Sequence, residues 1–467
     1  MNSLILQGIL GIVKRNVIIP APAGILYGLK NRIPISRKGR ETGLSVFRGV
    51  INSNRHSCEG TPEMLKDRKI VLGVTGGIAA YKAAELVRDL VRRGAKVRVV
   101  MTDNACKFIA PLTFETLSGN PVATDLFRAP GDFEIAHIAL AAFAELVVIA
   151  PATANLIGRM AAGLADDLLT TVLLATEAPI LLCPAMNAKM YANPVVQENL
   201  ARLVSRGHAV LEPGYGELAC RAEGQGRLAE PVEIAEEIES ILTTKDLRGE
   251  HILITAGPTQ EPFDPVRFIS NYSSGKMGFA LAVMARRRGA TVTLVSGPTA
   301  LPAPRGVEFV PVQTAVEMRD AIVARIEAAT VVIKAAAVAD YRPAVCEPVK
   351  IKKKEGSLTV RLERNPDIIS EIAQKKGDRI LVGFSMESDH LIEHARSKLI
   401  EKGMDFIVAN DVTEPGAGFR GDTNVVRILD REGGVEAFPL MDKIDVAGVI
   451  LDRVKKIREN REVRDGR

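Results

Sequence analysis

The sequence lacks the cysteine patterns of several protein classes. Its five cysteines, Cys58, Cys106, Cys183, Cys220 and Cys346, include no C-x-x-C pair. This spacing indicates neither a zinc ribbon nor a disulfide framework. Free thiols in a chain of 467 residues are typical of a reducing compartment, so we expect a cytoplasmic protein.

The N-terminal segment lacks a run long enough to cross a membrane, which takes roughly 20 apolar residues. The apolar stretch Leu4–Val13 stops at Lys14-Arg15, and two prolines interrupt residues 17–29. The charges follow the apolar stretch, which is the wrong order for a secretory signal. A targeting or membrane-surface role for residues 1–63 stays open, but we prefer Met64 as the natural start of the protein.

The folded part of the chain also has little net charge. The whole sequence carries +5 at neutral pH, of which residues 1–63 contribute +6, so the remainder carries −1. A near-neutral body gives no argument for binding nucleic acid. The length predicts two or three domains rather than one core.

No Walker A loop is present, yet the chain twice shows a strand, a polar turn and a helix. The apolar run Lys69–Val74 leads into Thr75-Gly76-Gly77, and His251–Ala256 leads into a loop that ends at 271–278 (N-Y-S-S-G-K-M-G). Such a turn points backbone N–H groups and a positive helix end at an anion, usually a phosphate. We therefore expect two phosphate-holding domains and two consecutive chemistries.

Short apolar runs alternate with helical stretches, which predicts the α/β class: two doubly wound, Rossmann-like domains with mostly parallel sheets. The expected strands are Lys69–Val74, Lys96–Met101, Leu146–Ala150, Pro179–Cys183, His251–Ala256, Thr291–Ser296, Val331–Ala335, Ile380–Phe384 and Phe406–Ala409. The expected domains are an extension (1–63), a first domain (64–243), a linker (244–249), a second domain (250–457) and a frayed charged tail (458–467). Residues 212–231 are expected to form a mobile flap, and residues 350–364 an extended hairpin or flap.

Particular residues follow the strand ends of the first domain. They are His137, the segments 150–155 (A-P-A-T-A-N) and 184–187 (P-A-M-N), and Cys220 in the first flap. Each alone is typical of an ordinary turn or core residue. Together they resemble the flavin-dependent cysteine decarboxylases over residues 66–240, a family with a flavodoxin-like fold.

The second domain carries its own set of motifs. They are 257–267 (beginning G-P-T and ending D-P-V-R), 271–278, 335–341 (A-A-A-V-A-D-Y), 350–353 (K-I-K-K) and 365–367 (N-P-D). This set resembles phosphopantothenate–cysteine ligase. The two halves together resemble the bifunctional flavoproteins of coenzyme A biosynthesis from about residue 64 to residue 457.

The resemblance implies FMN as the cofactor of the first domain and assigns residues to its site. Those expected around FMN are Thr75, Gly76, Gly77, Thr102, Thr153, Asp167 and Met186. His137 would assist oxidation of the substrate, Asn187 would hold its carboxylate, and Cys220 would donate a proton to the ene-thiolate. A thiol with an ordinary pKa near ~8.5 is mostly protonated at neutral pH, which suits an acid.

For the second domain the resemblance implies ligation of cysteine to 4′-phosphopantothenate through an acyl nucleotide. CTP is the expected co-substrate, with ATP left open, and Mg²⁺ is the expected countercharge, without assigned ligands. Asn271 and Arg267 would hold the acyl intermediate and phosphopantothenate. The residues expected near the nucleotide are Ala336, Asp340, Lys350, Asn365, Pro366, Asp367, Ile368, Phe384, Lys398 and Lys402.

Trimers of the decarboxylases and dimers of the ligases imply a homo-oligomer such as a dodecamer. Two alternatives remain for the first domain: a flavin prenyltransferase-like enzyme and a non-enzymatic flavoprotein regulator. The joint presence of His137, Asn187 and Cys220 favours the decarboxylase. The H-x-x-E-H segment 390–394 matches an inverted zinc-protease pattern, but it continues the helix of Lys398 and Lys402, so we do not assign zinc to it.

Overall fold

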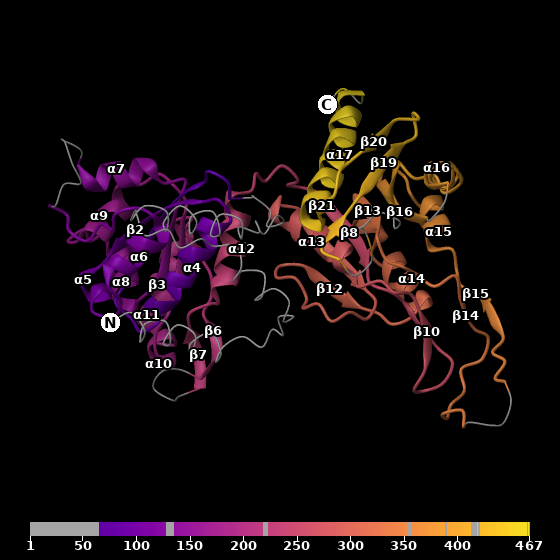
Figure 1. Cartoon of the computed structure of the whole chain (residues 1–467), viewed down its shortest axis with the longest axis horizontal. Coiled ribbons are helices and arrows are strands. Elements are labelled where there is room, and N and C mark those ends of the chain that lie inside the picture. Colours follow the sequence, from indigo (N-terminus) through magenta and orange to yellow (C-terminus); the bar gives the residue numbers. More distant parts are fainter. Residues whose placement is uncertain are drawn as a thin grey trace, which may run out of the picture. The chain divides into compact units, whose positions relative to one another are not determined.

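The computed structural model describes residues 65–127, 135–217, 223–352, 357–387, 390–411, 418, 421–464 and 466. The extension 1–63, Met64 and Cys220 lie outside the described residues. Two α/β sheets follow one another along the described chain, each flanked by helices (Figure 1).

The first sheet consists of five parallel strands in the order β2-β1-β3-β4-β5. Its strands are β1 (Lys69–Val74), β2 (Lys96–Met101), β3 (Leu146–Ala152), β4 (Ile180–Pro184) and β5 (Ala209–Val210). A separate hairpin consists of β6 (Gly214–Glu217) and β7 (Glu223–Arg227). The helices are α4 (Ala80–Arg92), α5 (Asp103–Cys106), α6 (Pro111–Ser118), α7 (Ala136–Phe143), α8 (Ala154–Ala162), α9 (Leu168–Ala175), α10 (Ala188–Tyr191), α11 (Pro194–Ser205) and α12 (Pro231–Leu242).

Helices cover both faces of this sheet, which is why its central strands are apolar along their whole length. Leu86 of α4, Phe114 of α6 and Ile238 of α12 belong to the core on one face. Ile157 of α8 and Leu169 of α9 belong to the core on the other face. The expected doubly wound α/β class is confirmed for this domain.

The second sheet has eight strands in the order β12-β11-β8-β13-β16-β17-β19-β20. They are β8 (His251–Ala256), β11 (Thr291–Ser296), β12 (Glu308–Pro311), β13 (Val331–Lys334), β16 (Ile380–Glu387), β17 (Phe406–Asp411), β19 (Val426–Asp430) and β20 (Val435–Ala437). The first six in the spatial order are parallel, and β19 and β20 join antiparallel at one edge. The sheet is therefore mostly parallel, as expected.

Helices also cover both faces of the second sheet. On one side lie α13 (Lys276–Arg287) and α17 (Lys443–Arg464); on the other lie α14 (Ala315–Val323), α15 (Ile368–Gln374) and α16 (Leu391–Glu401). A 3₁₀ turn, η1, covers Ile326–Ala328. Three short antiparallel pairs complete the domain: β9 (Gln260–Pro262) with β10 (Phe268–Ser270), β14 (Tyr341–Pro343) with β15 (Leu362–Arg364), and β18 (Thr423–Asn424) with β21 (Met441–Asp442).

Two expectations for the second domain need correction. The described residues of 350–364 do not show the expected hairpin within the segment: the strand there is β15, at its end, and it pairs with β14. The expected fraying after residue 457 is wrong, because α17 continues to Arg464. Arg458 pairs with Glu250 at 2.8 Å and Arg461 with Asp405 at 2.8 Å, which anchors the end of this helix on the domain.

Each sheet has a switch point, where the chain adds one strand on one side of a starting strand and a later strand on its other side. From β1 the chain adds β2 on one side and then β3 on the other; from β8 it adds β11 and later β13. In open parallel sheets, ligands bind outside the carboxyl ends of the strands at this switch point. The two topologies therefore indicate one site between β1 and β3 and another between β8 and β13.

A buried ion-pair network connects α12 to the second domain. Glu239 accepts from Arg93 at 2.7 Å and pairs with Arg287 of α13 at 2.7 Å. Both Glu239 and Arg287 are buried. Lys245 in the intervening segment donates to the carbonyls of Ser240 and Arg287. The joint between the domains is thus held by charges that have little access to water.

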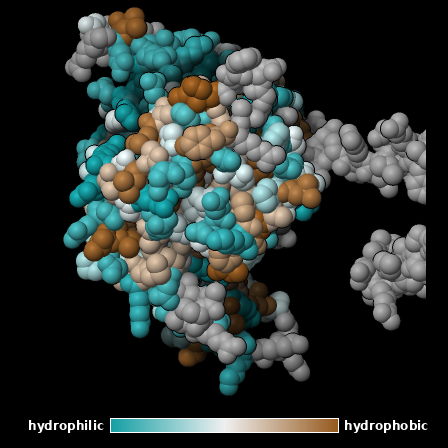
Figure 2. Space-filling model, turned by 90° about the vertical axis from the view of Figure 1, so that its left-hand side faces the viewer, coloured by the Kyte–Doolittle hydropathy of each residue, from teal (hydrophilic) through white to brown (hydrophobic). Residues whose placement is uncertain are grey.

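The surface of the first domain carries apolar side chains that are separated by hydrophilic ones (Figure 2). Phe127, Ile135 and Ile138, near the start of α7, are at least half exposed. Within the described residues, no helix combines the length and the apolar composition needed to cross a bilayer.

Gly278 in the first turn of α13 lies where a side chain has no room. A Cβ there would be 2.5 Å from Cβ of Ala256 and 2.9 Å from the carbonyl of Thr255. We therefore expect Gly278→Ala to push α13 off β8 and to lower the free energy of unfolding by about 1 to 3 kcal/mol. Urea unfolding of the second-domain transition measures this.

The matched control is Gly448→Ala in α17, because a Cβ there would meet nothing within 4 Å. Replacing a glycine inside a helix by alanine should raise the free energy of unfolding by about 0.5 to 1 kcal/mol. Equal effects of the two substitutions would contradict the close packing at Gly278.

Candidate functional sites

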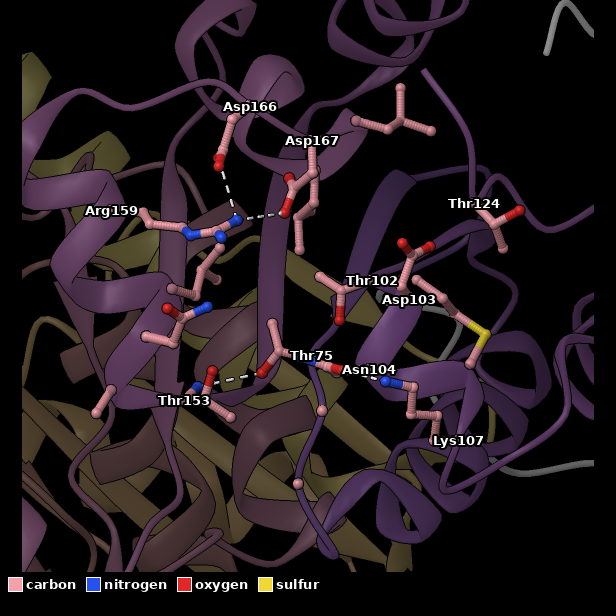
Figure 3. A pocket seen from close by; sticks show the side chains of 18 of the residues that line it. Thr75, Thr102, Asp103, Asn104, Lys107, Thr124, Thr153, Arg159, Asp166 and Asp167 are labelled. Atoms are coloured by element: carbon pink, nitrogen blue, oxygen red, sulfur yellow. Dashed lines mark hydrogen bonds and ion pairs between the residues drawn. The ribbon is translucent and has the colours of Figure 1, made fainter. Parts of the chain in front are cut away.

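A cavity of about 1180 Å³ lies at the switch point of the first sheet. Figure 3 shows Thr75, Thr102 and Thr153 around this cavity, each directly after one of the strands β1, β2 and β3. Asp167, which directly precedes α9, lies there too. All seven residues expected to bind the cofactor line it: Thr75, Gly76, Gly77, Thr102, Thr153, Asp167 and Met186. The roles of these residues stay predictions, but the structure brings them together.

Thr75 fixes the ends of the two central strands to each other. Its buried hydroxyl donates to the carbonyl of Pro151 at 2.6 Å and accepts from the backbone N–H of Thr153 at 3.1 Å. The next residue must be small, because a Cβ on Gly76 would lie 2.4 Å from Cβ of Asn104. These constraints explain why the turn after β1 has this sequence.

The wall opposite Thr75 is charged. Asp167 caps α9 by accepting from the backbone N–H of Thr170 at 2.7 Å, and Arg159 pairs with Asp166 and Asp167 at 3.1 Å each (Figure 3). Lys107 lies on another wall and donates to Asn104 at 2.9 Å. Sequence reasoning missed Arg159 and Lys107 because each lies on a helix where it could equally face water.

A second cavity, of about 570 Å³, adjoins the first at Gly77 and Met186. It contains Asn187, whose Oδ1 accepts from the backbone N–H of Lys189 at 2.9 Å and caps α10. Gly226 of the β6–β7 hairpin covers this cavity and approaches so closely that a Cβ would be 2.2 Å from the carbonyl oxygen of Met186. The hairpin thus packs directly on the segment of Asn187.

His137, a further catalytic candidate, does not line either of these cavities. His137 lies at the start of α7, and its Nδ1 is buried without a hydrogen-bond partner among the described residues. Cys220 lies outside the described residues. Of the two described residues expected to act in decarboxylation, Asn187 therefore lies beside the cofactor residues and His137 does not.

Two cavities meet at the switch point of the second sheet, where they share Lys334, Val338 and Phe384. The larger, of about 520 Å³, is called the outer cavity and the smaller, of about 200 Å³, the inner cavity. Eight expected nucleotide residues line the outer cavity: Asp340, Asn365, Pro366, Asp367, Ile368, Phe384, Lys398 and Lys402. Ala336 lines the inner cavity, together with the loop 273–278.

Charges concentrate in the outer cavity. Lys402 pairs with Asp367 at 2.5 Å, and burial, which would raise the pKa of Asp367, is outweighed by its hydrogen bonds with Lys402 and Ser370, so that pKa lies below its usual value. Burial lowers the pKa of Lys334, with Asp367 and Asp340 opposing that shift. Sequence reasoning missed Lys334 because it is the last residue of a strand that otherwise reads as buried and apolar.

Asn271, Arg267 and Lys350 are placed outside both cavities. Asn271 donates to the carbonyl of Ala337 at 3.1 Å, which brings it beside the inner cavity. Arg267 donates to Asp264 and to the carbonyl of Ile351, the residue after Lys350. Arg267 and Lys350 therefore lie near each other, but the structure does not join them to the nucleotide residues.

The segment 390–394 is the start of α16 rather than a metal site. His390 precedes α16 and lies 3.4 Å from the carboxylate of Glu393. Among the described residues, no three or more His, Cys, Asp and Glu side chains are grouped so that they could hold a metal ion.

Comparison with known proteins covers both domains. The profile of the Flavoprotein family matches residues 59–243, and that of the "DNA/pantothenate metabolism flavoprotein C-terminal domain" matches residues 247–457. The chain is 48% identical over 395 residues to the "Coenzyme A biosynthesis bifunctional protein CoaBC" of Bacillus subtilis, covering 84% of this chain and 97% of that protein. It is 47% identical over 395 residues to the protein of that name from Escherichia coli strain K12, again covering 84% and 97%.

Among solved structures, the C-terminal domain of a coenzyme A biosynthesis bifunctional protein CoaBC is 41% identical to this chain. The match covers 46% of this chain and all of that one, with a TM-score of 0.41. The chain matches the curated relatives named above over 97% of their length.

Asp264 is the buried anion that holds Arg267 in place. It accepts from Arg267 and from the backbone N–H groups of Val266, Arg267 and Ile351, which keeps the pKa of Asp264 well below its ordinary value near ~3.9. A carboxyl with a lowered pKa stabilises the fold above its unfolded-state pKa and loses that contribution as the pH falls toward its folded-state pKa.

Asp264→Asn should therefore lower the stability of the second domain most near neutral pH. The difference from the natural chain should shrink below about pH 4, where the unfolded chain takes up the proton. Thermal unfolding at a series of pH values measures this, and a difference that grows on acidification would contradict the assignment.

Proposed function

Because this chain belongs to the family of bifunctional coenzyme A biosynthesis proteins, we propose that it makes 4′-phosphopantetheine in two steps. The second domain joins cysteine to 4′-phosphopantothenate, and the first domain decarboxylates the product. The observation that carries this proposal is the presence, in one chain, of two polar cavities at two switch points. The first is lined by the seven residues expected at the cofactor, and the second by eight of those expected at the nucleotide.

We propose FMN as the cofactor of the first domain. The cavity of about 1180 Å³ is large enough for it, because ligand pockets commonly measure about 300 to 1,000 Å³. Thr102, Thr153 and the turn 75–77 would bind its polar groups, and the paired Asp167 and Arg159 would close one wall. When bound there, FMN would supply a reversible hydride acceptor for the oxidation and later reduction of the cysteine Cβ.

The residues of the adjoining cavity would handle the substrate. Asn187 would hold the carboxylate that leaves as CO2, and Met186 would line the passage to the cofactor. Cys220 would protonate the ene-thiolate that remains. His137 would assist the oxidation as a base or as an electrostatic partner. Since His137 lines neither cavity in the single chain, this role requires a site completed by another copy.

The second domain would activate an unreactive carboxylate. The carboxylate of 4′-phosphopantothenate attacks the α-phosphorus of CTP, which forms the acyl nucleotide and releases pyrophosphate. The amine of cysteine then attacks the acyl carbon and releases CMP. Lys398, Lys402 and Lys334 would offset the phosphate charge, and the cavity walls would align the reacting groups.

We propose that the chain is a cytoplasmic homo-oligomer. Trimers through the first domain and dimers through the second would give a closed assembly such as a dodecamer. The exposed apolar side chains of Ile135 and Ile138, which flank His137 in the sequence, support a partner copy at that face.

Purified protein supplied with 4′-phosphopantothenate, cysteine, Mg²⁺ and either CTP or ATP tests the sequence of steps. We expect phosphopantothenoylcysteine to form first, followed by CO2 and 4′-phosphopantetheine, detected by mass spectrometry. If neither nucleotide supports formation of phosphopantothenoylcysteine, the ligase assignment is wrong.

Cys220→Ser should separate the two domains chemically. We expect ligation at the normal rate and loss of CO2, but no accumulation of 4′-phosphopantetheine, because the ene-thiolate lacks its proton donor. Cys346→Ser, which replaces an exposed free thiol, is the matched control and should leave both steps unchanged. Normal production of 4′-phosphopantetheine by Cys220→Ser would contradict the role of this thiol.

Lys398→Met should affect only the ligase step. Removing one cation from the outer cavity should lower the ligation rate by about 10²-fold, because phosphate charge in the transition state loses a partner. Decarboxylation of added phosphopantothenoylcysteine should be unchanged. Lys375→Met, at an exposed position that does not line the cavity, is the control; an equal loss in both variants would contradict a local role.

A further inference from the structure

The inner cavity of the second domain contains two buried carboxamides that no assignment above uses. Asn410 and Asn424 line this cavity and are only 3% and 4% exposed. The Oδ1 atom of each is buried and has no hydrogen-bond partner among the described residues. A buried carbonyl oxygen without a partner is costly, which points to a ligand that supplies one.

Both side chains line the same cavity although they come from different strands. Asn410 lies near the end of β17 and is directly opposite Val426 of β19. Asn424 lies two residues before Val426, in β18. Both carboxamides therefore reach the same small space at the carboxyl end of the parallel strands.

The rest of the inner cavity is built for an anion. The N-terminus of α13, a helix of 12 residues, opens into it after Gly275, and Lys276, Lys334 and Lys443 line it. Lys443 donates to the carbonyls of Gly418 and Gly421, and Lys276 pairs with Asp422 at 2.6 Å. A helix N-terminus with lysines beside it favours phosphate.

The two Oδ1 atoms do not fit a phosphate by itself, because both partners would be hydrogen-bond acceptors. They fit a hard divalent cation, which prefers oxygen ligands, or the water molecules bound to it. Asp422 beside this cavity pairs with Lys276, and the described part of the chain offers no cluster of acidic or histidine side chains for a metal. Mg²⁺ is commonly held by few protein groups together with substrate phosphates.

We propose that Asn410 and Asn424 bind the divalent cation that accompanies the terminal phosphates of the nucleotide. This assignment rests on the proposed ligase function. The outer cavity then holds the nucleoside end, and the inner cavity, of about 200 Å³, holds the metal and the phosphates that leave as pyrophosphate. The cation binds with the nucleotide rather than to the empty site.

The test measures affinities for CTP and CMP by calorimetry, with and without Mg²⁺. In the natural chain Mg²⁺ should strengthen CTP binding and leave CMP binding almost unchanged. Asn410→Leu and Asn424→Leu should each reduce the Mg²⁺-dependent gain in CTP affinity by about 10-fold or more, the usual effect of losing a metal partner. Unchanged CMP affinity shows that the variants are folded.

Asn410→Asp should change the Mg²⁺ dependence of CTP binding in the direction opposite to Asn410→Leu. A purely structural role of Asn410 would not produce this. The added carboxylate should weaken CTP binding without metal by repulsion and strengthen its dependence on Mg²⁺. Asn365→Leu is the matched control, since its Oδ1 is also buried and without a partner but faces the outer cavity. Asn365→Leu should lower the affinities for CTP and CMP alike and leave the Mg²⁺-dependent gain in CTP affinity unchanged.

Mn²⁺ in place of Mg²⁺ gives a direct reading of the metal by electron paramagnetic resonance. The natural chain should bind Mn²⁺ in the presence of CTP, and the two leucine variants should bind it at least about 10-fold more weakly. A Mg²⁺-dependent gain that survives both leucine substitutions overturns the inference. Failure of the natural chain to bind either CTP or ATP would instead overturn the proposed ligase function.

Discussion

A buried threonine hydroxyl joins the diverging strands at each switch point, and the candidate sites depend on it. In the first sheet, Thr75 bonds the end of β1 to the segment after β3 through Pro151 and Thr153. In the second sheet, Thr255 at the end of β8 accepts from the backbone N–H of Ala336 at 3.1 Å. Parallel strands leave their carboxyl ends unpaired beyond the sheet, so these bonds fix the geometry of the loops that surround each cavity.

The cavities differ in kind although the sheets are similar. The first domain has one wide space for a resident cofactor and an adjoining space under a hairpin. The second has two smaller spaces joined at Lys334, which suits an elongated ligand with a nucleoside at one end and phosphates at the other. The chemistry of each half is thus set by the loops, since the parallel core alone specifies only where a ligand can lie.

The sequence predicted the central strands well because helices cover both faces of each sheet. Strands such as Lys69–Val74 and His251–Ala256 are continuous apolar runs, and their observed bounds agree with the expected ones. The end of α17 was missed because its stability comes from ion pairs of Arg458 and Arg461 with residues far away in the sequence. Local composition there looks like a charged tail.

The candidate site was predictable only where a motif marks it. The cofactor residues follow strand ends, so they could be named in advance, and the structure brings them to one cavity. Lys334, Asn410 and Asn424 carry no motif, because their place in a cavity depends on how distant strands come together. The position of His137 away from both cavities, with its Nδ1 atom buried, depends on packing that the sequence does not reveal.

The ion pair between Glu239 and Arg287 separates two kinds of damage to the joint between the domains. Substituting Glu239 in the intact chain leaves Arg287 buried without its carboxylate, which costs about 3 to 5 kcal/mol for such pairs. Substituting Arg287 leaves Glu239 paired with Arg93 of its own domain. The joint should therefore tolerate a change at Arg287 more readily than one at Glu239.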